Sequence, residues 1–239
     1  MRASAARALL ALGALCLVVP ALLAACTTVI TVQAPSAMKV SIDIKDYHQG
    51  TTQVAIHYAD ASLNTIEFVH RETVTCNGVY LKYDSSFYAQ LFGYGAYTGD
   101  VPPQPAGGTY NFVYTPAGGA AVSVSVPVVD APVTVTQPAS GATITIPTSA
   151  PFIFRFNGSG LANTSIVGSA ADSRFHYALS FALADTGAAS FNAPDFASFA
   201  PGPGTITISR ITSGKPDGSG FDSLGVSYEN STTIQDTWT

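Results

Sequence analysis

The sequence Met38-Lys39-Val40-Ser41-Ile42-Asp43-Ile44 alternates apolar and polar side chains at every position. A period of two is typical of a strand that turns one face to a core and the other to water. The same alternation recurs in Val54-Ala55-Ile56-His57-Tyr58 and in Thr65-Ile66-Glu67-Phe68. The chain is therefore predicted to be an all-β protein.

Further strands are predicted along the rest of the chain. We expect them at residues 73–83, 110–115, 121–129, 133–135, 143–146, 152–156, 175–183, 205–211 and within 224–237. Turn sequences such as Pro116-Ala117-Gly118-Gly119 separate them. The stretch Phe152-Ile153-Phe154-Arg155-Phe156 places three aromatic rings on one face of its strand. Short helical turns are expected after Asp84 and around Phe196 and Phe199.

A break near the middle divides the chain into two parts. Asp130-Ala131-Pro132 interrupts the run of strands, and alternation resumes in Val133-Thr134-Val135. We therefore predict a first β-sandwich domain over residues 38–129 and a second over residues 130–239. About seven short strands per roughly 100 residues is the density expected of an immunoglobulin-like sandwich.

This pattern resembles the tandem immunoglobulin-like or fibronectin-like modules of bacterial surface proteins. Asp130-Ala131-Pro132-Val133, followed by Pro138-Ala139-Ser140-Gly141, looks like the proline-bearing entry to such a module. The resemblance implies two tandem β-sandwich domains. The cysteine pair and core tryptophan of antibody domains are missing, because the one tryptophan is Trp238, next to the C-terminus.

The N-terminal segment has the pattern of an export signal. Arg2 and Arg7 precede an uncharged apolar stretch from Ala8 to Leu23. The stretch ends in Leu23-Ala24-Ala25-Cys26. This motif, with its branched apolar residue, two small residues and cysteine, resembles the lipobox of bacterial lipoprotein signal peptides.

The lipobox resemblance implies a covalent lipid anchor. The Cys26 thiol would receive a diacylglyceryl group, the signal peptide of residues 1–25 would be removed, and acyl chains such as palmitate would hold the protein at a membrane. Residues 26–37 then form a lipidated tether. Because Thr27 rather than aspartate follows the cysteine, the resemblance favours an outer membrane where one exists. The expected location is lipid-anchored and extracytoplasmic, at the cell membrane or the outer membrane.

Two alternatives for the N-terminus stay open. The apolar stretch is at the short end of the roughly 17–25 residues that a transmembrane helix needs, and Gly13 and Pro20 interrupt it. Cleavage after Ala25 without lipidation would also fit the small residues there. The cysteine is what favours the lipoprotein.

Composition argues against a nucleic-acid partner. The net charge is −5 and charged residues make up 10% of the chain, whereas phosphate contacts need clustered Lys and Arg. Of the three cysteines, Cys16 lies in the signal and Cys26 would be acylated, so no disulfide is expected. Cys76, between Val74 and Val79, is predicted to be a small buried side chain.

The sequence lacks recognisable catalytic or metal-binding motifs. It has no nucleophile elbow, phosphate-binding loop or dinucleotide fingerprint. The histidines His48, His57, His70 and His176 do not have zinc-site spacing. The loop 217–222 is oxygen-rich, but it lacks the rest of a calcium-binding loop and is interpreted as a hairpin turn. No cofactor and no metal are predicted.

An aromatic segment is the best candidate for ligand binding. Residues 80–97 contain seven Tyr and Phe side chains, interspersed with glycines. Most of these rings are expected to pack into the first core. The candidate ligand-binding residues are Tyr88, Tyr94 and Tyr97, because tyrosine suits recognition of sugars or protein surfaces. Of these, Tyr94 and Tyr97 are expected to be exposed, because glycines and Asp100 flank them.

These observations together favour a non-enzymatic, lipid-anchored protein of the bacterial cell envelope. Its β-sandwich modules would serve binding, adhesion or envelope assembly, with an envelope protein or polysaccharide as the partner. The alternative is an exported hydrolase acting on envelope or extracellular glycans. That alternative would use a pair of carboxylates such as Asp84 and Asp100.

Overall fold

The computed structural model describes residues 34–47, 50–68, 71–84, 95–128, 132–159, 163–182, 185–215 and 220–239. In this part of the chain every element is a β-strand except two short 3-10 helices, η1 (Pro35–Ala37) and η2 (Ala193–Phe196). Neither of these helices is long and apolar enough to cross a membrane. The prediction of an all-β protein is confirmed for the described residues.

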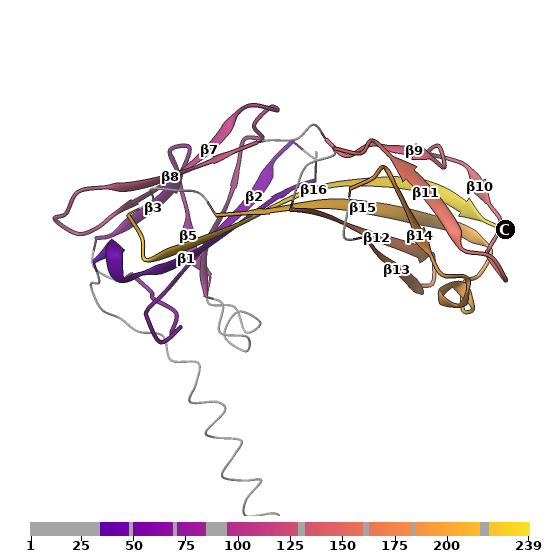
Figure 1. The fold of residues 1–239 in the computed structure, drawn as a ribbon, viewed down its shortest axis with the longest axis horizontal. Coiled ribbons are helices and arrows are strands. Elements are labelled where there is room, and N and C mark those ends of the chain that lie inside the picture. The colour runs from indigo at the N-terminus through magenta and orange to yellow at the C-terminus, as the bar shows by residue number, and fades with distance from the viewer. Residues whose placement is uncertain are drawn as a thin grey trace, which may run out of the picture.

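One large mixed sheet runs through the whole molecule (Figure 1). Its strands are β1 (Lys39–Asp46), β2 (Thr52–Ala59), β5 (Lys82–Asp84), β6 (Ala96–Val101), β10 (Thr143–Ile144), β12 (Thr164–Asp172), β13 (Tyr177–Ala182), β15 (Gly202–Gly214) and β16 (Ser223–Trp238). They lie in the order β13, β12, β15, β16, β1, β2, β6, β5, and β10 pairs with the end of β16. Figure 1 shows β15 and β16 as the long strands that connect the two ends of the molecule.

Two smaller antiparallel sheets cover this large sheet. The first consists of β3 (Thr73–Cys76), β4 (Val79–Tyr80), β7 (Thr109–Thr115) and β8 (Val122–Pro127), in the order β4, β3, β7, β8. The second consists of β9 (Val135–Gln137), β11 (Phe152–Phe156) and β14 (Ala188–Phe191), in the order β14, β11, β9. The four-stranded sheet encloses the first core and the three-stranded sheet encloses the second core.

Both cores lie on the same face of the large sheet. On β16, Leu224 and Tyr228 belong to the first core, and Ile234 and Trp238 belong to the second. These positions differ by even numbers, and the pairing of β16 with β15 has no register shift. Because side chains in a strand alternate between faces, all four point to one side. We call this side the inner face.

The first and last strands of the fold are neighbours. β1 pairs in parallel with the first half of β16, from Lys39 opposite Ser223 to Asp46 opposite Asn230. The second half of β16 pairs with β15 and β10. The C-terminal strand therefore contributes to both cores. The domain division at residue 130 stays a prediction.

Most predicted strands form, but three observed strands, β6, β12 and β14, were not predicted. β12 is rich in Ser, Ala and Gly, and its small side chains hide the apolar alternation. β6 lies where the sequence suggested a glycine-rich loop. Conversely, residues 65–68 form an isolated bridge from Ala59 to Thr65 instead of a full strand. The predicted turn around Phe196 is confirmed as η2, and the helix expected after Asp84 lies outside the described residues.

A distinctive turn follows β2. The Asp60 carboxylate accepts hydrogen bonds from the backbone N–H groups of Ser62 (2.8 Å) and Asn64 (2.9 Å) and from Asn64 Nδ2 (2.9 Å). The Leu63 N–H donates to the Asp60 carbonyl (3.0 Å). Leu63 has a φ of 67°, and its side chain is 68% exposed.

The turn that follows β12 repeats this arrangement. The Asp172 carboxylate accepts hydrogen bonds from the N–H groups of Arg174 and His176 (both 2.9 Å) and lies 2.8 Å from His176 Nδ1. The Phe175 N–H donates to the Asp172 carbonyl (3.1 Å), its φ is 63°, and its side chain is 76% exposed. The two turns therefore match bond for bond, with a large apolar residue at a left-handed position where glycine is usually preferred.

Candidate functional site

A row of buried polar side chains crosses the inner face between the two cores. Thr52 lies opposite Asp46, Asp46 lies opposite Asn230, and Asn230 lies opposite Arg210. Their exposed fractions are 0%, 3%, 1% and 1%, respectively. Four buried polar residues from β2, β1, β16 and β15 thus lie side by side across the inner face, and buried polar groups need partners.

Local strand geometry explains how the row arises. Asp46 follows Val40, Ile42 and Ile44 on the inner side of β1. Asn230 follows Tyr228 on the inner side of β16, before the apolar positions resume at Ile234. The period of two that buries the apolar residues therefore also buries these polar ones.

Hydrogen bonds tie the row to the segments above it. The Tyr110 hydroxyl donates to Thr52 Oγ1 (2.9 Å) and accepts from the Gln104 N–H (3.0 Å). The Val133 N–H donates to Asn230 Oδ1 (2.9 Å). The row thereby positions the loop before β7 and the segment that enters the second half of the chain.

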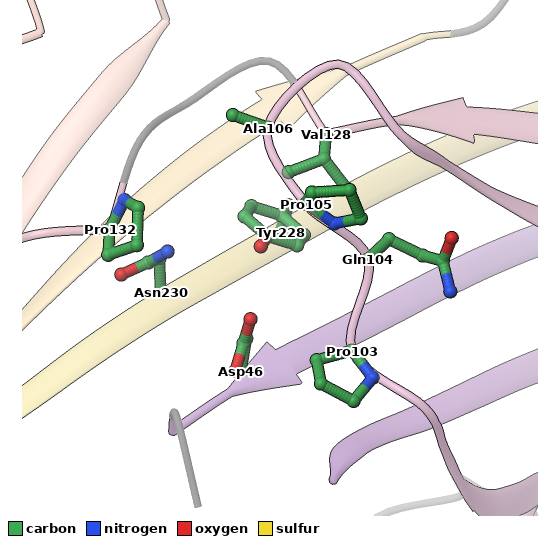
Figure 2. Close-up of a pocket in the computed structure, with 9 residues that line it drawn as sticks. All are labelled: Asp46, Pro103, Gln104, Pro105, Ala106, Val128, Pro132, Tyr228 and Asn230. Atoms are coloured by element: carbon green, nitrogen blue, oxygen red, sulfur yellow. The ribbon is translucent and has the colours of Figure 1, made fainter. Parts of the chain in front are cut away.

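A pocket opens between these two segments (Figure 2). Its volume is about 320 Å³. Asp46, Tyr228 and Asn230 come from the large sheet, and the other lining residues are Pro103, Gln104, Pro105, Ala106, Val128 and Pro132. Figure 2 shows the Asp46 side chain directed from the end of β1 toward the Tyr228 ring, with Pro132 on one side of that ring and Pro105 on the other.

The pocket combines rigid apolar walls with a polar floor. Three prolines, whose φ is fixed by the ring, supply most of the walls. The floor offers the Asp46 carboxylate, the Asn230 amide and one tyrosine ring. A few polar groups within an apolar lining are typical of small-molecule and side-chain binding pockets.

The electrostatics keep the neighbouring tyrosine neutral. Burial raises the pKa of the Tyr110 hydroxyl, its hydrogen bonds with Thr52 and Gln104 counteract this, and the Asp46 charge raises the pKa further. The hydroxyl therefore stays protonated at neutral pH and can donate to Thr52.

The Arg210 end of the row forms a buried ion pair. Arg210 Nε donates to Asp185 Oδ2 (2.7 Å), and Arg210 Nη2 donates to the Asn157 carbonyl. Ser159 donates to the same Asp185 oxygen through its N–H (2.9 Å) and its hydroxyl (2.5 Å). These contacts hold the segment after β11 and the segment before β14 against the large sheet. The pair has the arrangement of a structural ion pair.

The predicted lipidation site and two of the predicted ligand-binding tyrosines lie outside the described residues. These are Leu23, Ala24, Ala25, Cys26, Tyr88 and Tyr94. The expectation that Tyr97 is exposed was wrong, because its side chain is 7% exposed. Tyr97 lies opposite the buried Ile56, which places it on the inner face of β6. Its hydroxyl accepts a hydrogen bond from the Phe68 N–H (2.6 Å), and the two rings stack with centroids 5.3 Å apart.

Cys76 is buried, as predicted. It is 0% exposed within the first core, and burial raises the pKa of its thiol to about 12. A thiol that stays protonated is a poor nucleophile.

The described histidines do not converge. His57 Nε2 lies 3.2 Å from Thr65 Oγ1, and His176 pairs with Asp172. His48 and His70 lie outside the described residues, as does part of the loop 217–222. Within the described ranges, no three His, Cys, Asp or Glu side chains are grouped to hold a metal ion.

The carboxylates of the hydrolase alternative lie on neighbouring strands. Asp84 on β5 pairs with Ala96 on β6, four residues before Asp100. A rise of about 3.4 Å per residue from Ala96 to Asp100, together with about 4.8 Å between the two strands, places Asp84 and Asp100 roughly 14 Å apart. Glycosidase carboxylates lie within roughly 10 Å of each other. The separation of Asp84 and Asp100 therefore does not fit a glycosidase pair.

Sequence reasoning missed the pocket. A signal exists in β16, where the inner positions 224, 226 and 228 are apolar and position 230 is Asn. A polar residue inside a buried alternating run marks a possible site. Asp46 and Arg210, which lie opposite Asn230, come from distant segments of the chain. The row therefore cannot be recognised from the sequence.

The chain matches no protein-family model, and no curated protein is significantly similar to it.

Proposed function

We propose that this protein is a lipid-anchored, non-enzymatic component of the bacterial cell envelope that binds an envelope protein or polysaccharide. The single observation that carries the proposal is the motif Leu23-Ala24-Ala25-Cys26 after an apolar export segment. A lipidated Cys26 places the described β-structure at a membrane surface, attached through the tether of residues 26–37.

The repeated turn supports the arrangement as two related β-sandwich modules. The Asp60 and Asp172 turns share their hydrogen bonds, and each follows a strand that begins with a buried threonine, Thr52 or Thr164. The same turn in both halves of the chain is expected of tandem immunoglobulin-like modules. The large sheet then joins the modules through β15 and β16.

The pocket supports a binding role. It lies between the two cores, where its walls come from both halves of the chain, and pockets at such junctions are preferred ligand sites. Its size suits a small group, such as one sugar unit or one side chain of a larger partner. The Asp46 carboxylate would select a group that donates hydrogen bonds, and the Asn230 amide can donate through its NH2 group.

The anchor is tested with intact-mass spectrometry of the full chain extracted from membranes. The expected mass corresponds to cleavage before Cys26 plus a diacylglyceryl group, and Cys26→Ser should release the protein from the membrane fraction. A Cys26→Ser product that stays in the membrane would contradict lipid anchoring at this residue.

The pocket is tested with a matched pair of substitutions. Ala106 lines the pocket in a Pro-Ala-Gly-Gly turn, and Ala117 lies in an identical Pro-Ala-Gly-Gly turn elsewhere. Both turns have their first glycine at positive φ and close with a Gly N–H bonded to the Pro carbonyl. Ala106→Trp should abolish capture of envelope protein or polysaccharide, whereas Ala117→Trp should not. Equal capture by both variants would exclude the pocket as the binding site.

A further inference from the structure

The pocket between the two cores has an apolar rim and a charged floor (Figure 2). The rim residues Pro103, Pro105, Ala106 and Pro132 are exposed. Asp46, on the floor, is 3% exposed. A group that reaches the Asp46 carboxylate therefore has apolar side chains around the rest of its length.

The charge of the pocket comes from Asp46. It is the one charged side chain among the described residues that line the pocket, and Gln104 and Asn230 are neutral amides. Arg210, the cation of the buried row, lies on β15, and β16 separates it from Asp46. Its charge is balanced by another carboxylate, because Arg210 Nε donates to Asp185 Oδ2 (2.7 Å). The pocket therefore presents a negative charge to a group that enters it.

The other floor residues favour a cation as the ligand. Asn230 Oδ1 accepts a hydrogen bond from the Val133 N–H (2.9 Å), which fixes the direction of the amide. The Asp46 carboxylate is then the strongest acceptor on the floor. Figure 2 shows it directed toward the Tyr228 ring, and the face of a tyrosine ring attracts cations. A carboxylate and an aromatic ring together suit a positively charged group.

We propose that the pocket receives a lysine side chain of a partner protein, with the ammonium group at Asp46 and the methylene stem against the rim prolines. This inference rests on the binding role proposed above for the pocket. Lysine has a compact cation on a flexible four-carbon stem, and such stems pack along apolar surfaces. The single carboxylate on the floor matches the cation, and the prolines match the stem.

Two other cations match the pocket less well. An arginine side chain carries five N–H donors in a planar group, and the described lining offers one carboxylate for them. An amino sugar carries hydroxyl groups around its ring, which would lose water against the prolines without gaining hydrogen bonds. The lining therefore favours an envelope protein over a polysaccharide as the partner.

An NMR titration of the full chain tests the need for a charge, with the protein purified from whichever cell fraction holds it. The probe is N-acetyl-lysine methylamide. N-acetyl-norleucine methylamide is the matched control, because it has the same four-carbon stem without the ammonium group. The lysine probe should shift the resonances of Ala106 and Val128 in a saturable way, and the norleucine probe should bind at least about tenfold more weakly.

Substitutions on β1 test the role of the carboxylate. Asp46→Asn should weaken binding of the lysine probe roughly 30-fold or more, because it removes one partner of a nearly buried charge pair. Asp43→Asn is the matched control, since Asp43 lies on the same strand and is exposed on the opposite face. Ala106→Trp, which fills the rim and leaves the buried row intact, should also block the probe, whereas Ala117→Trp should not.

Three results would overturn the proposal. These are no saturable binding of the lysine probe, equal binding of the norleucine probe, and unchanged binding of the lysine probe to Asp46→Asn. Tighter binding of glucosamine than of the lysine probe at the same resonances would also overturn it, in favour of a polysaccharide. Loss of capture of the envelope partner in Ala106→Trp, with full capture in Asp46→Asn, would exclude lysine recognition but leave the proposed binding role intact.

Discussion

The Trp238 indole lies directly against the backbone of Gly204. A Cβ atom at Gly204 would contact the indole Nε1 and would approach the Ala171 carbonyl oxygen to 2.5 Å. Trp238 Nε1 donates a hydrogen bond to that same carbonyl (3.1 Å). The glycine therefore makes room for the last side chain of β16, which is 0% exposed and contacts Phe196 and Phe199.

Gly204→Ala should lower the free energy of unfolding by about 1–3 kcal/mol, because overpacking at a fixed backbone contact forces side chains and strands to shift. Urea denaturation measures the effect. Gly214→Ala is the control on the same strand, since a Cβ there has no atom within 4 Å. Equal losses in the two variants would contradict the packing of Trp238 on Gly204.

Two tyrosines on β7 should respond oppositely to loss of their hydroxyl groups. The Tyr114 hydroxyl is buried without a hydrogen-bond partner in the described residues, and burial raises its pKa to about 12. Tyr114→Phe should therefore stabilise the protein by up to about 1 kcal/mol. Tyr110→Phe should destabilise it by roughly 1–3 kcal/mol, because Thr52 and Gln104 lose a partner. Destabilisation by Tyr114→Phe would show that its hydroxyl is hydrogen-bonded.

Removing the Arg210 guanidinium should be costly. Arg210→Met leaves the Asp185 carboxylate buried without its cation, which typically costs about 3–5 kcal/mol. The double variant Arg210→Met with Asp185→Leu should recover much of this loss, because it removes both buried charges. A double-mutant cycle by chemical denaturation measures the coupling. Additive effects of the two substitutions would mean that the ion pair contributes nothing specific.

The Asp172 turn should make stability depend on acid pH. Burial raises the pKa of Asp172, but hydrogen bonds from His176, Ala200 and Arg174 outweigh this and hold the pKa well below its usual range. The carboxylate is thus more acidic in the folded than in the unfolded chain. Its contribution is fully present above the unfolded pKa of about 3.9 and is lost as pH falls below it.

Asp172→Asn tests that dependence. The variant should show a weaker fall in stability between about pH 4 and pH 2 than the unmodified chain. Thermal unfolding at a series of pH values measures it. An unchanged pH profile in the variant would mean that Asp172 is not the titrating group.

Individual elements show which features could be predicted from the sequence. β1, β2, β11 and β16 were predicted because alternation of apolar and polar residues is a local property of each strand. Burial of Cys76 followed from its apolar neighbours. β12 was missed because Gly168 and the surrounding small residues leave little apolar contrast. Gly168 is needed there, since a Cβ would approach Phe154 and Phe191 of the covering sheet to 2.8 and 3.1 Å.

The candidate site could not be predicted in the same way. Asp46, Asn230 and Arg210 are remote in the chain and become neighbours only when β1, β16 and β15 pair. Tyr97 was expected at the surface because glycines surround it. Pairing of β6 with β2 turns its ring inward, opposite Ile56.

The sequence by itself determined that the chain forms strands, which residues of each strand share a face, and that Leu23-Ala24-Ala25-Cys26 follows an apolar segment. These features depend on backbone alternation and on residues close together in the chain. Only the tertiary structure decided that β1 lies beside β16, that both cores share one sheet, and that a row of buried polar residues lies between them. Strand pairing joins segments of any sequence separation, so its outcome depends on how all the apolar faces are buried together.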